Sequence, residues 1–523
     1  MSDRFAWSVL LCAAGTWLGF ANPLLHLPVL ALVLPMSLAW LGLQARSLRQ
    51  AFFRGWLAAS AGYAAALYWV SIPVHEFGSL PWIAAVPCPI LLGLYLGLYA
   101  GLFCLALAWA APRTGWPVLI LLAWTLWASL EYIREILLTG FPWLGLAQAF
   151  APWPVFLQAV SVLGAHGFSG LLAGIGVGFV LGVHRPRALI APAAALCGLT
   201  LFGVWHIQHP ALTQQSINLP AALIQGNIEQ GLKWDPAFQR QTLNRYLRMS
   251  RNAVREHGAE LVVWPETAIP FYVQENTELS TKLRSFCRNH QVALFTGAPG
   301  YSLRDGGTEV VSHNLVYLFG PDGLVRGTYT KEHLVPFGEY IPFGSYLPFI
   351  TRMVQGVGDF RPGDRTAPLE YKDLALGGLI CYEVIFSGLV QHRVAAGANL
   401  LINVSNDAWF GRSSGPRQHL HQAVLRSIEQ GRGMLRATNT GVSAIIDPQG
   451  RILQSTTLFA PETLQADSLP AGHGRTFFSR HYHLLRAAFF LLAAIAMLWI
   501  RMHNPGKPQP DHTCGKHTQR HER

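Results

Sequence analysis

Residues 83–111 read IAAVPCPILLGLYLGLYAGLFCLALAWAA and contain no Asp, Glu, Lys or Arg. A helix needs about 20 mostly apolar residues to cross the hydrocarbon core of a bilayer, and this stretch exceeds that length. Further apolar segments of the same kind lie at 6–21, 24–43, 51–72, 117–137, 168–184, 188–207 and 484–500. The pattern predicts a polytopic helical bundle of about eight membrane spans, with about seven spans in residues 1–207 and a closing transmembrane helix at 484–501.

The composition of the 523-residue chain agrees with a membrane protein. Hydrophobic residues make up 51% of the chain and charged residues only 13%, whereas soluble domains average about 25% charged residues. This composition excludes intrinsic disorder and a purely cytosolic enzyme as descriptions of the whole chain. Residues 208–483 are different, because their amino-acid composition is that of an ordinary globular protein. We therefore expect one sizeable water-facing domain between the seventh and eighth spans.

The positions of the basic residues predict the orientation of the bundle. Arginines lie between spans two and three, four and five, and six and seven, and basic residues also follow the last span, but the loop at 73–82 has no Lys or Arg. By the positive-inside rule, the basic side is cytoplasmic. We expect both termini in the cytoplasm, a basic, disordered tail at 502–523, and a domain at 208–483 in the periplasm of a bacterial inner membrane. This topology explains the net charge of +11 without nucleic acid binding.

Two polar features of the bundle are open to interpretation. Arg134 lies three residues after Glu131, so these side chains are expected to pair along a helix, or alternatively to shape a polar headgroup site. Prolines interrupt the apolar segment 141–163, which predicts an interfacial or re-entrant piece, and Trp143 suits the headgroup zone.

The water-facing domain predicts an α/β fold. Short β-rich runs alternate with amphipathic segments, which indicates layers of helices and strands. The predicted strands are 219–224, 261–264, 292–296, 314–319, 324–329, 375–380 and 400–404, and the predicted helices are 237–257 and 418–436.

Three reactive side chains, those of Glu266, Lys331 and Cys381, follow predicted strands. Strand ends in layered α/β folds direct loop side chains into a common cleft. A thiol is a good nucleophile as the thiolate, a carboxylate can accept its proton, and an ammonium group can stabilise an oxyanion. The three groups therefore suffice for acyl transfer through a thioester. The spacing alone leaves open that Cys381 only packs in the core.

The sequence motifs around these residues resemble those of a known family. Three motifs are similar to those of the nitrilase superfamily, which has a carbon–nitrogen hydrolase fold with a Glu-Lys-Cys triad. They are Trp264-Pro265-Glu266, Lys331-Glu332-His333-Leu334-Val335-Pro336-Phe337-Gly338-Glu339-Tyr340 and Cys381-Tyr382-Glu383. The chain further resembles the apolipoprotein N-acyltransferase family in two respects. Seven predicted spans precede such a domain and one follows it, and the motif Thr139-Gly140-Phe141-Pro142-Trp143 is similar to one of that family. The resemblance covers the whole chain except its basic tail, and it implies an α-β-β-α sandwich joined to the membrane bundle.

The resemblance also implies a reaction. Members of the family move a fatty acyl chain from a phospholipid, usually phosphatidylethanolamine, through a cysteine thioester to the N-terminal amine of a diacylglyceryl-cysteine apolipoprotein. Carried over by motif, Cys381 is the nucleophile, Glu266 the general base and Lys331 the oxyanion-stabilising cation. No metal or cofactor is implied. The implied partners are the phospholipid donor, the diacylated apolipoprotein and membrane lipids, and we expect a monomer.

Four further residues match supporting or substrate-binding positions of the family, and they are Glu339, Glu383, Tyr382 and Trp234. Glu339 is alternatively an ion-pair partner that fixes Lys331. Glu383 is more readily interpreted as orienting loops than as moving protons. Trp234 either packs in the core or lines the entry to the cleft.

Two rival functions remain at this point. A membrane-anchored amidase or nitrilase has the same triad, with water as the second nucleophile, and a non-catalytic transporter or scaffold needs its thiol only for structure. The apolar loop at 336–350 either packs under the domain or enters the membrane interface, and the second alternative favours lipid substrates. A His and Cys cluster near 512–521 is more simply part of the basic tail.

Overall fold

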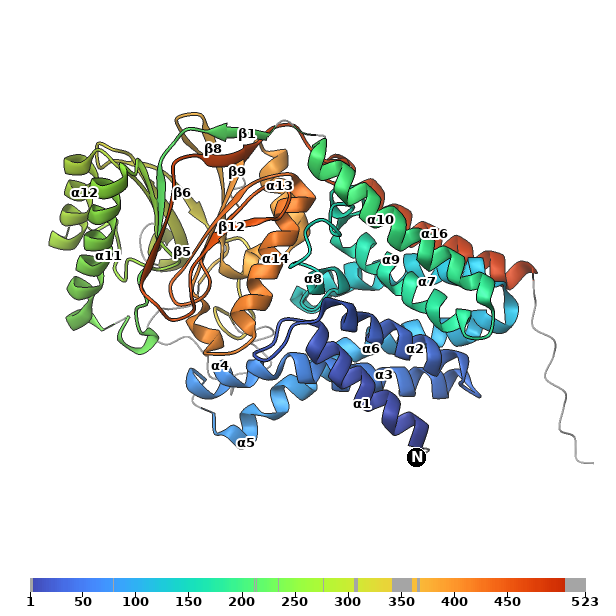
Figure 1. Ribbon diagram of the computed structural model, residues 1–523. Coiled ribbons are helices and arrows are strands. Elements are labelled where there is room, and N and C mark those ends of the chain that lie inside the picture. The colour runs from blue at the N-terminus through green and yellow to red at the C-terminus, as the bar shows by residue number, and fades with distance from the viewer. Residues whose placement is uncertain are drawn as a thin grey trace, which may run out of the picture.

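The computed structural model describes residues 3–503, except 79, 211, 213, 234, 276, 305–308, 341–359 and 365–366. A helical bundle and an α/β domain lie side by side (Figure 1). The helices of the bundle are α1 (Asp3–Gly19), α2 (Val33–Leu43), α3 (Leu48–Ala66), α4 (Ser71–Glu76), α5 (Trp82–Ala85), α6 (Pro87–Ala110), α7 (Trp116–Ile136), α8 (Leu146–Ala149), α9 (Val160–Gly182), α10 (Ile190–Gln208), α15 (Phe477–Arg480) and α16 (Tyr482–His503).

Several helices of the described chain are long and apolar enough to cross a membrane. Five pass by length and composition, and they cover Trp82–Arg113, Trp116–Thr139, Val160–Gly182, Pro186–Gln208 and Tyr482–His503. A sixth span arises if Leu48–Ala66 and Tyr68–Glu76, which are bent by 61°, count as one. Two N-terminal apolar helices are shorter, Phe5–Gly19 and Pro28–Leu43. The multi-pass bundle is thus confirmed, while the number of eight spans stays a prediction.

A glycine allows helices α3 and α6 to approach each other closely. A Cβ atom added at Gly97 of α6 would lie 2.2 Å from the Ser60 hydroxyl oxygen and 2.8 Å from the Trp56 carbonyl oxygen, both in α3. Only glycine permits this spacing, which is typical of packing between membrane helices.

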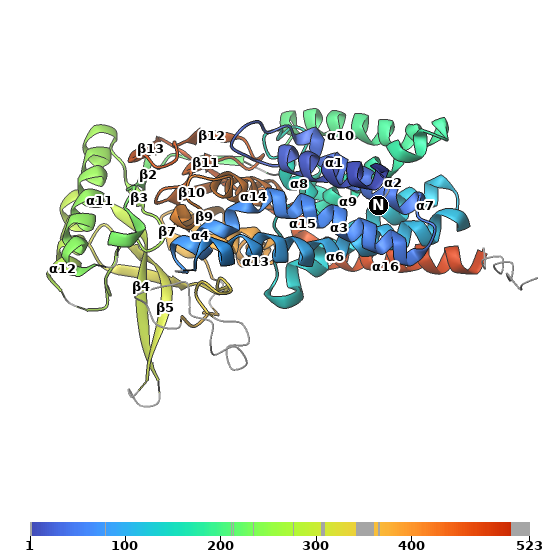
Figure 2. The ribbon, with the colours of Figure 1, turned by 90° about the horizontal axis from the view of Figure 1, so that it is seen from below.

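The α/β domain contains two six-stranded sheets. One has the order β13-β2-β3-β4-β5-β6 and the other β12-β11-β10-β9-β8-β7. The strands are β1 (Gln214–Ile217), β2 (Ala221–Gln225), β3 (Leu261–Val263), β4 (Ala293–Arg304), β5 (Glu309–Phe319), β6 (Val325–Thr330), β7 (Leu369–Tyr371), β8 (Leu374–Ile380), β9 (Leu400–Ser405), β10 (Met434–Thr438), β11 (Ala444–Ile446), β12 (Ile452–Ser455), β13 (Glu462–Ala466) and β14 (Leu469–Gly472). The β4–β5 hairpin projects from the body of the domain (Figure 2).

The two sheets pack face to face through one apolar core. Side chains of β2, β3, β4 and β5 interdigitate there with those of β8, β9 and β10. The helices α11 (Pro236–His257) and α12 (Glu278–His290) cover the outer face of the first sheet. The helices α13 (Ser387–Ala395) and α14 (Gly415–Gln430) cover the second sheet on the side of the bundle (Figure 1). This arrangement is the α-β-β-α sandwich that the motifs predicted.

One predicted helix, 418–436, is wrong at its C-terminal end. Helix α14 ends at Gln430 because Gly431 adopts the left-handed conformation, with φ +61°, and caps the helix. The chain then continues as β10, which pairs in parallel with β9 in the middle of the second sheet. Amphipathic periodicity does not show where a buried helix ends and a buried strand begins, so the two elements look like one helix in the sequence.

Helix α14 connects the domain to the bundle. Its Gln418 side chain is buried, and the amide oxygen accepts hydrogen bonds from the indole nitrogens of Trp69 (3.0 Å) and Trp143 (2.9 Å). The amide nitrogen donates to the carbonyl oxygens of Ala21 and Ala66, each at 3.1 Å. One side chain of the domain therefore contacts several separate segments of the bundle.

The segment 141–163 is helical only in parts, and its interfacial or re-entrant placement stays a prediction. It contains the short helix α8 and the start of α9, so α9 begins before the predicted span at 168–184. Trp143 is 1% exposed, and its indole nitrogen hydrogen-bonds to Gln418 of α14, so the side chain packs between the bundle and the domain; its placement in the headgroup zone stays a prediction.

Candidate active site

The predicted triad comes from both sheets of the sandwich. Glu266 lies just beyond the end of β3 and Lys331 directly follows β6, so both belong to the first sheet. Cys381 directly follows β8 of the second sheet and begins a short 3-10 helix, Cys381–Ile385. Its φ is +51°, a conformation that side chains other than glycine rarely adopt. Strained backbone of this kind persists where surrounding contacts hold it, and it is common at functional sites.

Lys331 is at the centre of a buried polar cluster. Its ammonium nitrogen donates to Glu339 Oε1 at 2.8 Å and to Glu266 Oε1 at 3.4 Å. Asn314 Nδ2 donates to the same two oxygens, at 3.0 Å and 2.8 Å respectively. The structure thus brings Glu266, Lys331 and Glu339 together and adds Asn314, which the sequence analysis did not identify.

Backbone amides hold the two carboxylates from the other side. Asn406 N donates to Glu266 Oε2 at 3.0 Å, and Val335 N donates to Glu339 Oε2 at 2.8 Å. Burial alone would lower the pKa of Lys331, but the neighbouring Glu339 and Glu266 raise it above its ordinary value. The lysine therefore stays charged, and the ion-pair role considered for Glu339 is present in the structure.

The Cys381 thiol is buried beside this cluster. Burial raises its pKa above the ordinary value, and the charge of Glu266 raises it further, while Lys331 and a hydrogen bond with Ser405 act in the opposite direction. The resting thiol is therefore neutral. A nucleophile of this kind needs a base close by, and the carboxylates that act on the thiol are those of Glu266 and Asp407. Asp407 is paired with His419 and Arg436, so Glu266 is the candidate base.

Glu383 connects the two halves of the site. Its side chain is fully buried, and Oε1 accepts hydrogen bonds from the Tyr329 hydroxyl (2.6 Å) and from the backbone nitrogens of Glu332 (2.6 Å) and His333 (3.1 Å). Its Oε2 accepts from Ile380 N at 2.7 Å. One carboxylate therefore joins the loop that follows the lysine to the strand that precedes the thiol. This geometry supports the loop-orienting interpretation.

Tyr382 connects the nucleophile loop to the bundle. Its hydroxyl donates to the carbonyl oxygen of Gly140 at 3.0 Å, and its ring packs against Phe386. Gly140 belongs to the motif at 139–143 that the sequence analysis singled out, and its φ is +85°. The membrane part thus contacts the residue next to the nucleophile.

Several predicted features lie outside the described residues. These are Trp234, most of the apolar loop at 336–350, and the His and Cys cluster of the tail. At the described start of that loop, Phe337 is 40% exposed and Tyr340 is half-buried.

A buried cluster behind Cys381 escaped the sequence analysis. His419 Nε2 lies 3.2 Å from the Cys381 carbonyl oxygen, and its Nδ1 lies 3.0 Å from Asp407 Oδ1 and 3.1 Å from Arg436 Nη2. Arg436 Nη2 also donates to Asp407 Oδ2 at 2.8 Å. When the ring proton is on Nε2, His419 donates to the carbonyl of the strained cysteine. Asp407 follows β9, so the strand-end rule points to it, but nothing in the sequence marks His419 or Arg436 as buried.

A prediction follows for this histidine. We expect His419→Phe to lower kcat for acyl transfer by about tenfold with little change in KM, because one hydrogen bond near 1.4 kcal/mol no longer fixes the Cys381 peptide. Steady-state kinetics and thermal unfolding measure the two effects. His421→Phe is the matched control, since His421 lies on the same helix but stacks on His26. Equal losses in the two variants, or a change in KM alone, would contradict this role.

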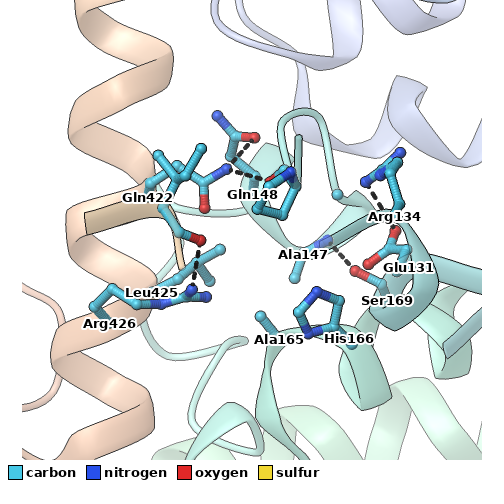
Figure 3. Close-up of a pocket in the computed structure, with 13 residues that line it drawn as sticks. Glu131, Arg134, Ala147, Gln148, Ala165, His166, Ser169, Gln422, Leu425 and Arg426 are labelled. Atoms are coloured by element: carbon cyan, nitrogen blue, oxygen red, sulfur yellow. Dashed lines mark hydrogen bonds and ion pairs between the residues drawn. The ribbon is translucent and has the colours of Figure 1, made fainter. Parts of the chain in front are cut away.

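A small polar cavity lies where α7, α8 and α9 meet α14 (Figure 3). The predicted pair is present, with Arg134 Nη2 3.9 Å from Glu131 Oε1, and Gln422 Nε2 of α14 donates to Gln148 Oε1 at 3.1 Å. The cavity volume is about 10 Å³, which is room for about one water molecule. The structure thus shows the predicted ion pair, and the alternative of a polar headgroup site stays a prediction.

Comparisons with known proteins agree with the geometry. Residues 13–178 match the family model of the apolipoprotein N-acyltransferase N-terminal domain, and residues 220–471 match that of the carbon-nitrogen hydrolase. The chain is 36% identical over 440 residues to an apolipoprotein N-acyltransferase of Geobacter metallireducens, covering 83% of this chain and 84% of that relative. The chain belongs to the apolipoprotein N-acyltransferase family.

Other members of the family are similar over nearly their whole length. The relative from Azotobacter vinelandii is 35% identical over 480 residues, covering 88% of this chain and 89% of its own. The relative from Pseudomonas aeruginosa is 34% identical over 493 residues, covering 91% and 92%. Membership confirms the prediction of an acyltransferase with a nitrilase-like domain and membrane helices, and it disfavours the non-catalytic scaffold.

Proposed function

We propose that this acyltransferase moves a fatty acyl chain from a phospholipid, phosphatidylethanolamine in particular, to the N-terminal amine of a diacylglyceryl-cysteine apolipoprotein. The acyl chain passes through a thioester on Cys381. The observation that supports this most strongly is the buried cluster in which Lys331 contacts both Glu266 and Glu339 beside the thiol. The direct packing of this domain on a membrane bundle supports a lipid donor.

In the first half-reaction, Glu266 accepts the thiol proton and the Cys381 sulfur attacks the ester carbonyl carbon of the phospholipid. The oxyanion that forms is stabilised by the Lys331 ammonium, a contribution of about 3 kcal/mol for one such donor. When the tetrahedral intermediate collapses, the carbon–oxygen bond to the glycerol breaks. Glu266 returns its proton to that oxygen, lysophospholipid leaves and the thioester remains.

In the second half-reaction, a neutral N-terminal amine attacks the thioester carbonyl. Glu266 accepts the proton that the amine loses, and Lys331 again stabilises the oxyanion. The carbon–sulfur bond breaks, an amide forms, and the sulfur recovers its proton from Glu266. Two half-reactions on one nucleophile predict ping-pong kinetics.

The remaining features of the proposal concern support and location. Glu339 fixes Lys331, Glu383 fixes the loops, Tyr382 orients the nucleophile segment and Trp234 contributes to substrate binding. The chain acts as a monomer in a bacterial inner membrane, with the domain at 208–483 periplasmic, the bundle at 1–207, the closing helix at 484–501 and both termini cytoplasmic. The basic residues of the connections support this orientation.

A two-substrate assay tests the proposed function against the amidase alternative. Purified protein in detergent is given phosphatidylethanolamine with a labelled acyl chain and a synthetic diacylated lipopeptide. We expect label on the lipopeptide amine, release of lysophospholipid, and parallel lines in double-reciprocal plots. Hydrolysis of small amides without acylation of the lipopeptide would favour the amidase and overturn the proposal.

A further inference from the structure

A second lysine, Lys233, is buried next to the active site. It lies between a short 3-10 helix, Gln230–Leu232, and helix α11, and only 2% of its surface is exposed. Its ammonium nitrogen donates to the carbonyl oxygen of Glu266 at 3.1 Å and to Thr267 Oγ1 at 2.6 Å. Thr267 has a φ of +45°, so these two hydrogen bonds hold a left-handed turn directly after the proposed base.

The partners recorded for this ammonium group in the described part of the chain are neutral oxygens. A buried charge without an ionic partner costs several kcal/mol unless other charges compensate it. An uncharged, apolar side chain of similar size would fill the same space without this cost. The burial of a lysine here therefore needs an electrostatic reason.

The charges of the site supply that reason. Glu266 and Glu339 together carry two negative charges, and both contact the one ammonium group of Lys331. With a neutral thiol, this cluster is left with one excess negative charge, which opposes formation of a thiolate or an oxyanion. Burial lowers the pKa of Lys233 to about 8, while Glu266 and Cys381 raise it, so the group is mostly charged at neutral pH. Its charge balances the excess.

We propose that Lys233 is a positioning residue of the active site, which neutralises the excess charge of the Glu266–Glu339–Lys331 cluster and so stabilises the anion that forms at Cys381. Lys233 acts through Glu266 and its turn, without touching the substrate. The inference deepens the proposed function and rests on it for its relevance to acyl transfer. The charged groups that act on the thiol are Glu266, Lys331 and Asp407, and those that act on Lys233 are Glu266 and Cys381.

The test measures the thiol directly. The rate at which iodoacetamide alkylates Cys381, with loss of iodide from the reagent, is followed against pH by mass spectrometry of the Cys381 peptide in the full-length protein. We expect Lys233→Met to raise the midpoint of this titration by about one pH unit and to slow alkylation near pH 7.5 by about tenfold, because the loss of a positive charge that interacts with Cys381 disfavours the thiolate. In acyl transfer, kcat falls and KM changes little.

Two controls separate charge from support of the turn. Thr267→Val removes one of the two hydrogen bonds but keeps the ammonium group, so we expect the midpoint to stay in place and kcat to fall by less than about threefold. Lys282→Met removes an exposed lysine of α12, whose Nζ donates to Asn244, and is expected to change nothing. If Lys233→Met unfolds the protein, Lys233→Gln replaces it, since the amide still donates to the Glu266 carbonyl.

An unchanged midpoint in Lys233→Met, or an equal change in Thr267→Val, would overturn the inference and leave Lys233 as a support for the turn. This outcome differs from failure of the proposed function. The alkylation midpoint reports on the thiol whether or not the acceptor is a lipoprotein, whereas the proposed function fails in the two-substrate assay.

Discussion

Cys381→Ala is expected to reduce acyl transfer by about 10⁴- to 10⁶-fold, to the limit of detection, because removal of a covalent nucleophile leaves no route to a thioester. The same change is expected to cost about 1 kcal/mol of unfolding free energy, since one small buried atom is lost from a backbone that already tolerates a side chain. Transfer of labelled acyl chains measures the first effect, and thermal unfolding in detergent measures the second.

The matched control for this variant is Cys287→Ala. Cys287 is also a buried, free cysteine of the α/β domain, but it lies on α12 and faces the core between that helix and the first sheet. We expect it to retain activity with a comparable loss of stability. Acyl transfer that survives in Cys381→Ala would contradict the proposed thioester, and equal inactivation of both variants would point to misfolding.

Lys331→Ala is expected to lower kcat by about 10²- to 10³-fold while KM changes much less. The ammonium group matters most when the oxyanion develops, and loss of one such donor costs about 3–4 kcal/mol of transition-state stabilisation. Lys331→Arg should not restore full activity, because a planar guanidinium does not reproduce the geometry of a compact ammonium between two carboxylates. Steady-state kinetics of acyl transfer measure both variants.

Removal of Lys331 also leaves two buried carboxylates facing each other, so a structural cause must be separated from a chemical one. The double variant Lys331→Ala with Glu339→Gln removes one of these charges. We expect it to recover stability but not kcat. Recovery of kcat in the double variant, or a change confined to KM, would show that the lysine does not act on the transition state.

The three triad residues were predictable because each directly or closely follows a strand and sits in a specific motif. The end of a strand is a local feature, and the sandwich brings the ends of β3, β6 and β8 to one place. Glu266, Lys331 and Cys381 could therefore be placed together before the fold was known. Family membership was predictable for the same reason, since whole motifs occur in order along the chain.

Glu339, Glu383 and Tyr382 were predictable from the same motifs, but three other residues near the site were not, because their positions depend on burial that sequence does not show. Asn314 is within a strand, Lys233 is in a loop, and His419 is on a helix with several polar residues, so each resembles a surface residue in sequence. Only tertiary packing buries them against the triad. The contact of Trp143 with the domain could not be predicted for a related reason, since its hydrogen-bond acceptor, Gln418, is more than 270 residues away along the chain.

The contact between bundle and domain has a consequence for catalysis. The Tyr382 hydroxyl donates to Gly140, and Gly388 N donates to Glu135 Oε1 at 3.3 Å, so the membrane part holds the segment that follows the nucleophile at two points. The bundle therefore helps to shape the site in addition to anchoring the domain. This arrangement explains why the catalytic domain and the membrane helices form one folded unit.

The most direct test is mass spectrometry of the intact protein isolated from its own membrane, followed by digestion. We expect a fatty-acyl mass on the peptide that contains Cys381, and its removal by hydroxylamine or by a diacylated lipopeptide, with the lipopeptide gaining the same mass. A peptide without an acyl group under conditions in which the protein transfers acyl chains, or an acyl group on another residue, would contradict a thioester on Cys381.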